Sequence, residues 1–164
     1  LECLGRAGEP VVAVAYEHTP DALSHALAAL RPLAAQRGGR LWCVFGCGGD
    51  RDASKRPLMG AIACQNADQV VVTSDNPRSE KAESIIAHIL LGLAHSKAVD
   101  VQSNRALAIA DTVARAAAND VILVAGKGHE QTQEIAGVKH VFSDREHAQQ
   151  ALRSRRLQKT EVRT

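Results

Sequence analysis

The stretch LWCVFGCGGDRD, residues 41–52, decides the fold class. Its first five residues are apolar, which predicts a strand buried on both faces, and a glycine-rich loop follows at once. The same order recurs along the chain, where apolar runs at 11–16, 70–73 and 121–125, and a weaker one at 99–101, alternate with helical patterns. This alternation predicts an α/β domain with a mostly parallel sheet.

Local signals mark where helices begin and where the sheet direction changes. Thr19 followed by Pro20 predicts a helix start, and Ser143 with Glu146 forms a capping box that opens the last helix. Gly137 separates two extended runs within residues 131–142, so we expect a hairpin or an antiparallel edge strand near the C-terminus. We expect one domain over residues 1–152, followed by a flexible basic tail at 153–164.

The net charge of +2 is distributed unevenly. Five cations and one anion lie within residues 153–164, so this tail carries +4 and the rest of the chain carries −2. Such a tail is either an arm that binds nucleic acid or a solvated terminus. No aromatic residue is interleaved with the charges, which favours the solvated terminus, and we expect no nucleic-acid partner.

The four cysteines form no CxxC pair, and no histidine lies at ligand spacing from two of them. We therefore expect no metal site. No signal peptide or apolar run of membrane length is visible, which predicts reduced thiols, a cytoplasmic protein and no membrane partner. The first residue is leucine, which suggests a fragment of a longer protein.

The loops that follow the predicted strands contain most of the unusual residues. Their sequences are EHTP, GCGGDRDASKRP, SDNPRS and GKGHE. Because ligands of an open parallel sheet collect beyond the carboxyl ends of its strands, we expect these four loops to converge on one site.

Two of these loops invite comparison with phosphate-binding motifs. GCGGDRD is either a weak phosphate loop or a tight turn, and the density of charged residues behind it favours a functional role. GKGHE does not form a P-loop, because Val121 stands where the first glycine is required and Gly128 where Ser or Thr is required. The chain therefore lacks the usual cradle for a nucleoside triphosphate and Mg²⁺.

The SDNPR loop places a carboxylate, an amide and a guanidinium within five residues. Arg78 is suited to bind a carboxylate, although Asp75 could instead cap a turn beside a solvated arginine. His18 and His129 each lie in a loop after a strand, where a hydrogen-bonding role is more common than catalysis. We assign no catalytic residue.

Six strings in this order identify a resemblance: HTPDAL, FGCGGDRD, KRPLMGAIA, DNPR, AGKGHE and FSDRE. Over residues 1–152 the chain resembles the C-terminal domain of the Mur ligases, in the MurE type that selects meso-diaminopimelate. The resemblance implies a Rossmann-like, three-layer α/β domain with one antiparallel strand, which agrees with the reading from the residues alone.

The resemblance also implies a function in peptidoglycan biosynthesis. Such ligases use ATP to phosphorylate the carboxylate of UDP-MurNAc-L-Ala-D-Glu, and the amine of the incoming amino acid then displaces phosphate. ATP, Mg²⁺ and the UDP-linked dipeptide are expected to be held mainly by N-terminal and central domains that this chain lacks. We therefore expect the chain to present the amino acid and to be inactive alone.

By the same resemblance, Arg78 would bind the distal carboxylate of diaminopimelate, and Glu130 its distal ammonium. Lysine lacks this carboxylate and would leave Arg78 unpaired, which can discriminate by about 10⁴-fold. The substrate-binding residues implied are Arg51, Asp75, Asn76, Arg78, Gly126 and Glu130.

The chain departs from the family at its first predicted strand. Ala15 stands where the family has an aspartate associated with the nucleotide, whereas His18, expected near the nucleotide, is retained. Two alternatives to a ligase domain therefore stay open: a non-catalytic remnant or free-standing module that binds a diamino acid, and an unrelated nucleotide-binding domain.

Overall fold

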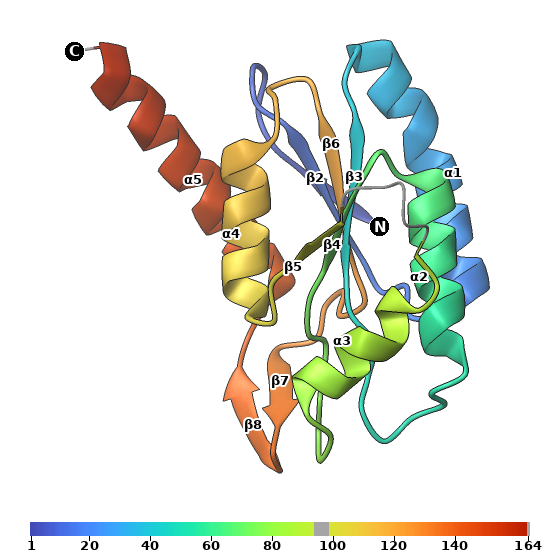
Figure 1. The fold of residues 1–164 in the computed structure, drawn as a ribbon. Coiled ribbons are helices and arrows are strands. Elements are labelled where there is room, and N and C mark those ends of the chain that lie inside the picture. The colour runs from blue at the N-terminus through green and yellow to red at the C-terminus, as the bar shows by residue number, and fades with distance from the viewer. Residues whose placement is uncertain (94–98, 164) are drawn as a thin grey trace.

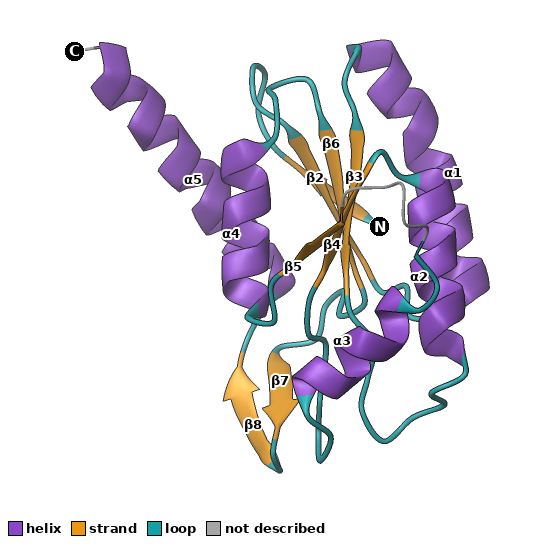
Figure 2. Cartoon of the chain, in the orientation of Figure 1, coloured by secondary structure: helices purple, strands orange, loops and turns teal. Residues whose placement is uncertain are grey.

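The computed structural model describes residues 1–93 and 99–163, which form one main sheet, a small hairpin and five helices (Figures 1 and 2). In chain order the elements are β1 (Glu2–Leu4), β2 (Val11–Ala15), α1 (Pro20–Arg37), β3 (Leu41–Phe45), α2 (Lys55–Asn66), β4 (Gln69–Val72), α3 (Ala82–Leu90), β5 (Val99–Val101), α4 (Arg105–Arg115), β6 (Val121–Ala125), β7 (Thr132–Ile135), β8 (Val138–Val141) and α5 (Asp144–Arg163).

The main sheet has the strand order β1-β2-β6-β3-β4-β5. All neighbours pair in parallel except β1, which pairs antiparallel with β2 at one edge. The predicted α/β class and mostly parallel sheet are confirmed. The edge strand β1 was not predicted, because its three residues carry no apolar run.

Helices cover both faces of the sheet, which makes the domain three-layered (Figure 1). Helices α1, α2 and α3 pack on one face, where β3 contributes Cys43 and Phe45, and α4 and α5 pack on the other, where β3 contributes Trp42 and Val44. Both sets of side chains are buried because alternate residues of a strand point to opposite faces. This explains why β3 is apolar throughout.

The expected helix signals are present. The Thr19 hydroxyl accepts a hydrogen bond from the Ala22 N–H at 3.2 Å, with Pro20 in the first turn of α1. The Ser143 hydroxyl accepts one from the Glu146 N–H at 3.2 Å at the start of α5. Both starts are therefore set by local side-chain caps.

The expected C-terminal hairpin is also present. Strands β7 and β8 pair antiparallel in a separate two-stranded sheet, joined by a turn in which Gly137 has φ +78°. All four residues of β8 are exposed. The hairpin lies beyond the main sheet, at the end where β3 and β4 finish (Figure 2).

The C-terminal basic segment has regular secondary structure, and its expected flexibility stays a prediction. Its residues through Arg163 continue α5, and Thr164 lies outside the described residues. Arg155 donates to the carbonyls of Val113 and Ala116 at the end of α4, so its charge satisfies an open helix terminus. The domain boundary at 152 itself stays a prediction.

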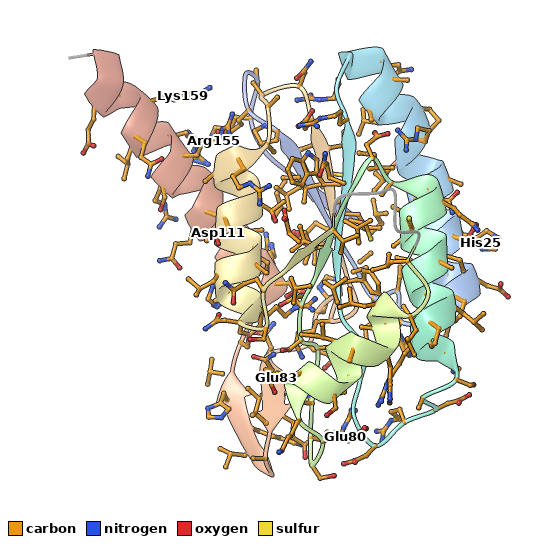
Figure 3. The ribbon with its side chains drawn as sticks, in the orientation of Figure 1. His25, Glu80, Glu83, Asp111, Arg155 and Lys159 are labelled. Carbon is orange, nitrogen blue, oxygen red and sulfur yellow. The ribbon has the colours of Figure 1, made fainter. Side chains whose placement is uncertain are left out.

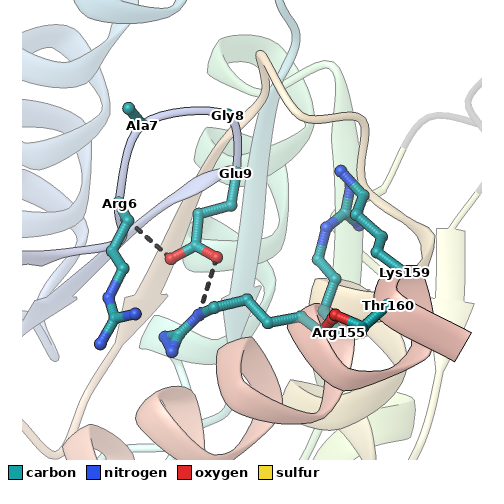
Figure 4. Close-up of a pocket in the computed structure, with 8 residues that line it drawn as sticks. Arg6, Ala7, Gly8, Glu9, Arg155, Lys159 and Thr160 are labelled. Carbon is teal, nitrogen blue, oxygen red and sulfur yellow. Dashed lines mark hydrogen bonds and ion pairs between the residues drawn. The ribbon is translucent and has the colours of Figure 1, made fainter. Parts of the chain in front are cut away.

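A second contact holds this helix to the turn between β1 and β2. The buried Glu9 carboxylate accepts the Arg6 N–H at 2.7 Å and pairs with Arg156 Nε at 3.1 Å (Figure 4). The cavity of about 440 Å³ drawn there lies where β2 begins, at the opposite end of the strand from the predicted ligand loops. Arg155 and Lys159 are labelled on this part of α5 in Figure 3.

None of the helices within residues 1–93 and 99–163 combines the length and the hydropathy needed to cross a bilayer.

Candidate functional site

The four loops converge as predicted, because the strands that precede them, β2, β6, β3 and β4, are neighbours in the sheet. Together they enclose a cavity of about 410 Å³. All the residues expected at the site line it: His18, Arg51, Asp75, Asn76, Arg78, Gly126 and Glu130.

Asn76 organises the end of the cavity that follows β4. Its Oδ1 accepts hydrogen bonds from Lys127 Nζ at 2.7 Å and from the Glu134 N–H at 2.9 Å. Its Nδ2 donates to Glu130 Oε2 at 3.3 Å. Since both ends of this amide are engaged, Asn76 fixes the orientation of Glu130 in the cavity.

Arg78 is held in an uncommon backbone conformation. Its φ is +54°, in the left-handed region that residues with a Cβ rarely occupy. The Arg78 N–H donates to Glu134 O at 3.0 Å, and its carbonyl accepts from the Ala136 N–H at 2.8 Å. Strain of this kind persists where neighbouring structure enforces it, and here the hairpin of β7 and β8 enforces it through both backbone groups of Arg78.

The glycine-rich loop approaches the SDNPR loop closely. The Gly49 N–H donates to Asn76 O at 2.8 Å, and a Cβ at Gly49 would lie 1.8 Å from Pro77 O. The tight-turn interpretation therefore accounts for this glycine. Gly48 lies between two arginines, because a Cβ there would meet Arg78 Nη1 at 2.8 Å and Arg51 Cγ at 3.5 Å.

Gly126 closes the end of the cavity that follows β6. Its φ is +126°, and its N–H donates to Ala15 O at 3.0 Å. A Cβ at this position would lie 3.0 Å from Asp75 Oδ2. Glycine is thus needed both for the backbone angle and for the approach to the carboxylate.

The cavity carries charges of both signs. Asp75 is 6% exposed, and its Oδ1 is a buried atom with no hydrogen-bond donor, although Lys127 Nζ lies 3.2 Å away at ion-pair distance. Glu130 lies 3.9 Å from the same ammonium. Carboxylates therefore collect around Lys127, whereas the side chains of Arg51 and Arg78 approach Gly48.

Three buried cations in and around the cavity were assigned no individual role from the sequence. Lys127 and Arg105 are at most 1% exposed and Arg56 is 2% exposed. Nothing in the local sequence distinguishes them from solvated charges, and Lys127 was considered only as part of a failed P-loop. Buried cations are costly unless they are paired, so each has built-in partners.

Arg105 connects the strand ends on which the cavity is built. It forms a bidentate pair with Asp144 at 2.7 and 2.8 Å, and both side chains are fully buried. It also donates to Ser74 O and Ala125 O, at the ends of β4 and β6. Through Asp144, the FSDRE string thus helps to position the strand ends that carry the site.

Arg56 likewise holds the glycine-rich loop in place through buried contacts. It donates to Gly48 O at 3.0 Å and pairs with Glu80 at 2.7 Å. Hydrogen bonds from Arg56 and from the Asp50 N–H lower the pKa of Glu80 to about 2, so this carboxylate stays ionised at neutral pH. Glu80 is labelled in Figure 3 at the end of the sheet where the hairpin lies.

Two further residues at the cavity bear on its chemistry. Burial raises the pKa of the Cys47 thiol to about 12, and the nearby Asp75 adds to this, so Cys47 is not a nucleophile at neutral pH. His18 packs against the Tyr16 ring, with 4.6 Å between centroids. Among the described residues no group of three or more His, Cys, Asp or Glu side chains is arranged to hold a metal ion.

Comparison with known proteins identifies the family. Residues 1–128 match the family described as "Mur ligase, glutamate ligase domain". The chain is 63% identical over 155 residues to the UDP-N-acetylmuramoyl-L-alanyl-D-glutamate--2,6-diaminopimelate ligase of Acidovorax sp. (strain JS42), covering 94% of this chain and 31% of that protein. The protein of the same name from Neisseria meningitidis serogroup A is 55% identical over 156 residues, covering 95% of this chain and 31% of that protein.

A solved structure of a UDP-N-acetylmuramoyl-L-alanyl-D-glutamate--2,6-diaminopimelate ligase superposes with a TM-score of 0.86 at 40% identity. The match covers 94% of this chain and 31% of that one. The chain therefore spans about a third of the length of the relatives that it matches.

Proposed function

The chain belongs to the Mur ligase family, as its C-terminal domain, and from this premise we propose that it presents meso-diaminopimelate to an ATP-dependent ligase. The ligase would join this amino acid to UDP-MurNAc-L-Ala-D-Glu as the third residue of the peptidoglycan stem peptide. The names of the relatives support the substrate, and the charge pattern of the cavity supports the role of this domain.

The observation that carries the proposal is the separation of charge within one cavity. Arg51 and Arg78 flank Gly48, whereas Asp75 and Glu130 lie around Lys127. The distal end of diaminopimelate is itself a zwitterion, with a carboxylate and an ammonium on one carbon. A cavity with paired cations and paired carboxylates matches that end, because each ligand charge meets the opposite sign.

Individual roles follow from this match. Arg78 binds the distal carboxylate, with Arg51 as a second cationic partner. Asp75 and Glu130 bind the ammonium. Asn76 and Gly126 shape the cavity around the ligand. These residues orient the attacking amine, and orientation of this kind can contribute about 7–11 kcal/mol to a bimolecular step.

ATP and Mg²⁺ belong, in this proposal, mainly to parts of the protein outside the chain. His18 and Tyr16 lie at the rim of the cavity and are the nucleotide-proximal side chains. Ala15 offers no side-chain acceptor, which weakens this contact. Cys3, Cys43 and Cys47 are free thiols, which supports a cytoplasmic location.

Because of Ala15, a second candidate function remains beside the ligase domain. A remnant or free-standing module would retain the diamino-acid cavity but would support no ligation. Both functions require binding of diaminopimelate, so they differ only in what happens when the chain is joined to a complete ligase core.

Calorimetric titration of the 164-residue chain with meso-diaminopimelate and with lysine tests the binding role. Arg78→Ala should weaken diaminopimelate binding on the order of 100-fold, since hydrogen bonds to charged groups contribute about 1.5–3 kcal/mol each. Arg153→Ala, in an exposed position on α5, is the matched control and should bind as the wild type does. Equal affinity of Arg78→Ala and wild type would refute the assignment of Arg78.

A chimera then separates the ligase domain from the remnant. The corresponding C-terminal part of the Acidovorax relative is replaced by this chain, and formation of the tripeptide product is measured. Ligation that depends on Arg78 supports the ligase domain. A folded chimera that binds diaminopimelate without ligating it supports the remnant.

A further inference from the structure

Glu134 on β7 is attached to the SDNPR loop through its backbone. Its N–H donates to Asn76 Oδ1 at 2.9 Å, and its carbonyl accepts from the Arg78 N–H at 3.0 Å. Since both backbone groups are engaged, the Cα of Glu134 is held beside this loop.

The Glu134 carboxylate lies beside the Arg78 guanidinium. Its Oε2 is 3.6 Å from Arg78 Nε, and the two side chains are 32% and 22% exposed. The nearby Asp50 carboxylate also attracts Arg78, but it accepts hydrogen bonds from the Ser79 N–H at 3.2 Å and the Ser79 hydroxyl at 2.6 Å. Glu134 lies at ion-pair distance and is therefore positioned as an internal counter-ion of Arg78.

The geometry leaves one edge of the guanidinium for a ligand. Nε faces Glu134, and Nη1 donates one hydrogen bond to Gly49 O at 2.9 Å. Three N–H groups on Nη1 and Nη2 remain, which suffices for a bidentate carboxylate. Glu134 does not line the cavity, whereas Arg78 does.

We propose that Glu134 is a specificity-determining residue that compensates the charge of Arg78 when the ligand provides no distal carboxylate. The inference rests on the proposed function. When lysine occupies the cavity, Arg78 still has Glu134 as its partner. The preference for diaminopimelate over lysine is therefore smaller than the roughly 10⁴-fold expected if Arg78 were left unpaired. A ligand carboxylate must also share Arg78 with a like charge, which weakens its binding.

Glu134→Gln removes the carboxylate and keeps the backbone contacts. In calorimetry of the 164-residue chain we expect diaminopimelate to bind about 3- to 5-fold more tightly, a size typical of partly exposed ion pairs. Lysine should bind no better than before, so the selectivity ratio widens. Glu83→Gln, exposed on α3 and labelled in Figure 3, is the matched control and should change neither affinity.

A second measurement needs no ligand. The ¹⁵N–¹H resonance of Arg78 Nε, assigned by its loss in Arg78→Ala, should shift in Glu134→Gln and stay in place in Glu83→Gln. An unchanged resonance would show that the pair does not form in solution and would overturn the proposal.

The outcomes separate the two claims. If wild type binds diaminopimelate and Glu134→Gln leaves the selectivity ratio unchanged, the inference fails and the proposed function stands. Weaker diaminopimelate binding by Glu134→Gln would make Glu134 a ligand of the ammonium and would also overturn the inference. If no variant binds diaminopimelate although the Arg78 resonance shifts, the proposed function fails and the selectivity role falls with it.

Discussion

Replacing Lys127 by methionine keeps most of the side-chain volume and removes a fully buried ammonium from beneath the cavity. Lys127 Nζ donates to Asn76 Oδ1 at 2.7 Å and to Thr132 O at 3.0 Å, and lies 3.2 Å from Asp75 Oδ1. These contacts join the loop after β4 to the start of β7. Their loss should destabilise the fold and loosen the cavity at the same time.

The expected loss in the free energy of unfolding follows from the groups that Lys127→Met leaves without a partner. Asp75 is 6% exposed, and its Oδ1 has no hydrogen-bond donor, so the substitution strands a buried carboxylate. Removal of one partner of a buried pair typically costs about 3–5 kcal/mol. Asn76 loses one of its two donors but keeps the Glu134 N–H, so we expect a value near the lower end of that range.

Urea unfolding followed by tryptophan fluorescence measures this cost. Trp42 is the single tryptophan of the chain, is 2% exposed and lies on β3 near the start of that strand, away from the cavity. Its signal therefore reports global unfolding. Lys81→Met, at an exposed position before α3, is the matched control and should change the free energy of unfolding by less than about 0.5 kcal/mol.

The double variant Lys127→Met/Asp75→Asn tests the cause. Turning the stranded carboxylate into a neutral amide should recover about 1–2 kcal/mol relative to Lys127→Met alone, because contacting residues are coupled by energies of this size. A loss below about 1 kcal/mol for Lys127→Met, or a double variant less stable than the single one, would refute the reasoning from the buried pair.

Two further predictions concern the core and the cavity. Burial alone would raise the pKa of Asp120, but hydrogen bonds from the Arg40 N–H, the Trp42 indole and the Ala117 N–H lower this pKa overall. The ionised Asp120 carboxylate therefore stabilises the fold fully above the unfolded pKa of about 3.9, and this stabilisation is lost as pH falls through the lower folded pKa. Asp120→Asn should cost about 2 kcal/mol at pH 7 and flatten the dependence of the urea midpoint on pH between 5 and 2; an unchanged pH dependence would contradict this. Gly126→Ala should weaken diaminopimelate binding by at least about tenfold in calorimetry, because its Cβ would press on the Asp75 carboxylate and φ is +126°; wild-type affinity would show that the cavity adapts.

Strands buried on both faces were the most predictable part of the fold. The apolar runs at 41–45 and 121–125 coincide with β3 and β6, because nothing polar interrupts these strands. The edge strand β1 escaped prediction, since its pairing with β2 depends on residues ten positions or so along the chain and not on its own composition.

Convergence of the ligand loops was predictable from a rule about parallel sheets, independently of any family. The supporting contacts were not, because they join residues far apart in sequence. Lys127 meets Asn76, and Arg105 meets Asp144, across 51 and 39 positions. A sequence pattern treats such charges as solvated, and only the folded structure reveals their partners.

The basic C-terminal segment illustrates the same limit. Its charge density suggested a solvated tail, whereas Arg155 and Arg156 lie against α4 and Glu9. A charged residue can satisfy a helix end or a buried carboxylate as well as face water, and composition does not distinguish these cases.

The left-handed backbone of Arg78 has a consequence for attempts to transplant selectivity between ligases. Its N–H is bonded to β7 and its carbonyl to the hairpin turn at Ala136, so the DNPR string and the hairpin form one structural unit. A recipient that receives only the four residues would let Arg78 relax toward an ordinary φ and turn its guanidinium out of the cavity. The transferable module is therefore residues 74–80 together with 127–136, and a graft should move both or neither.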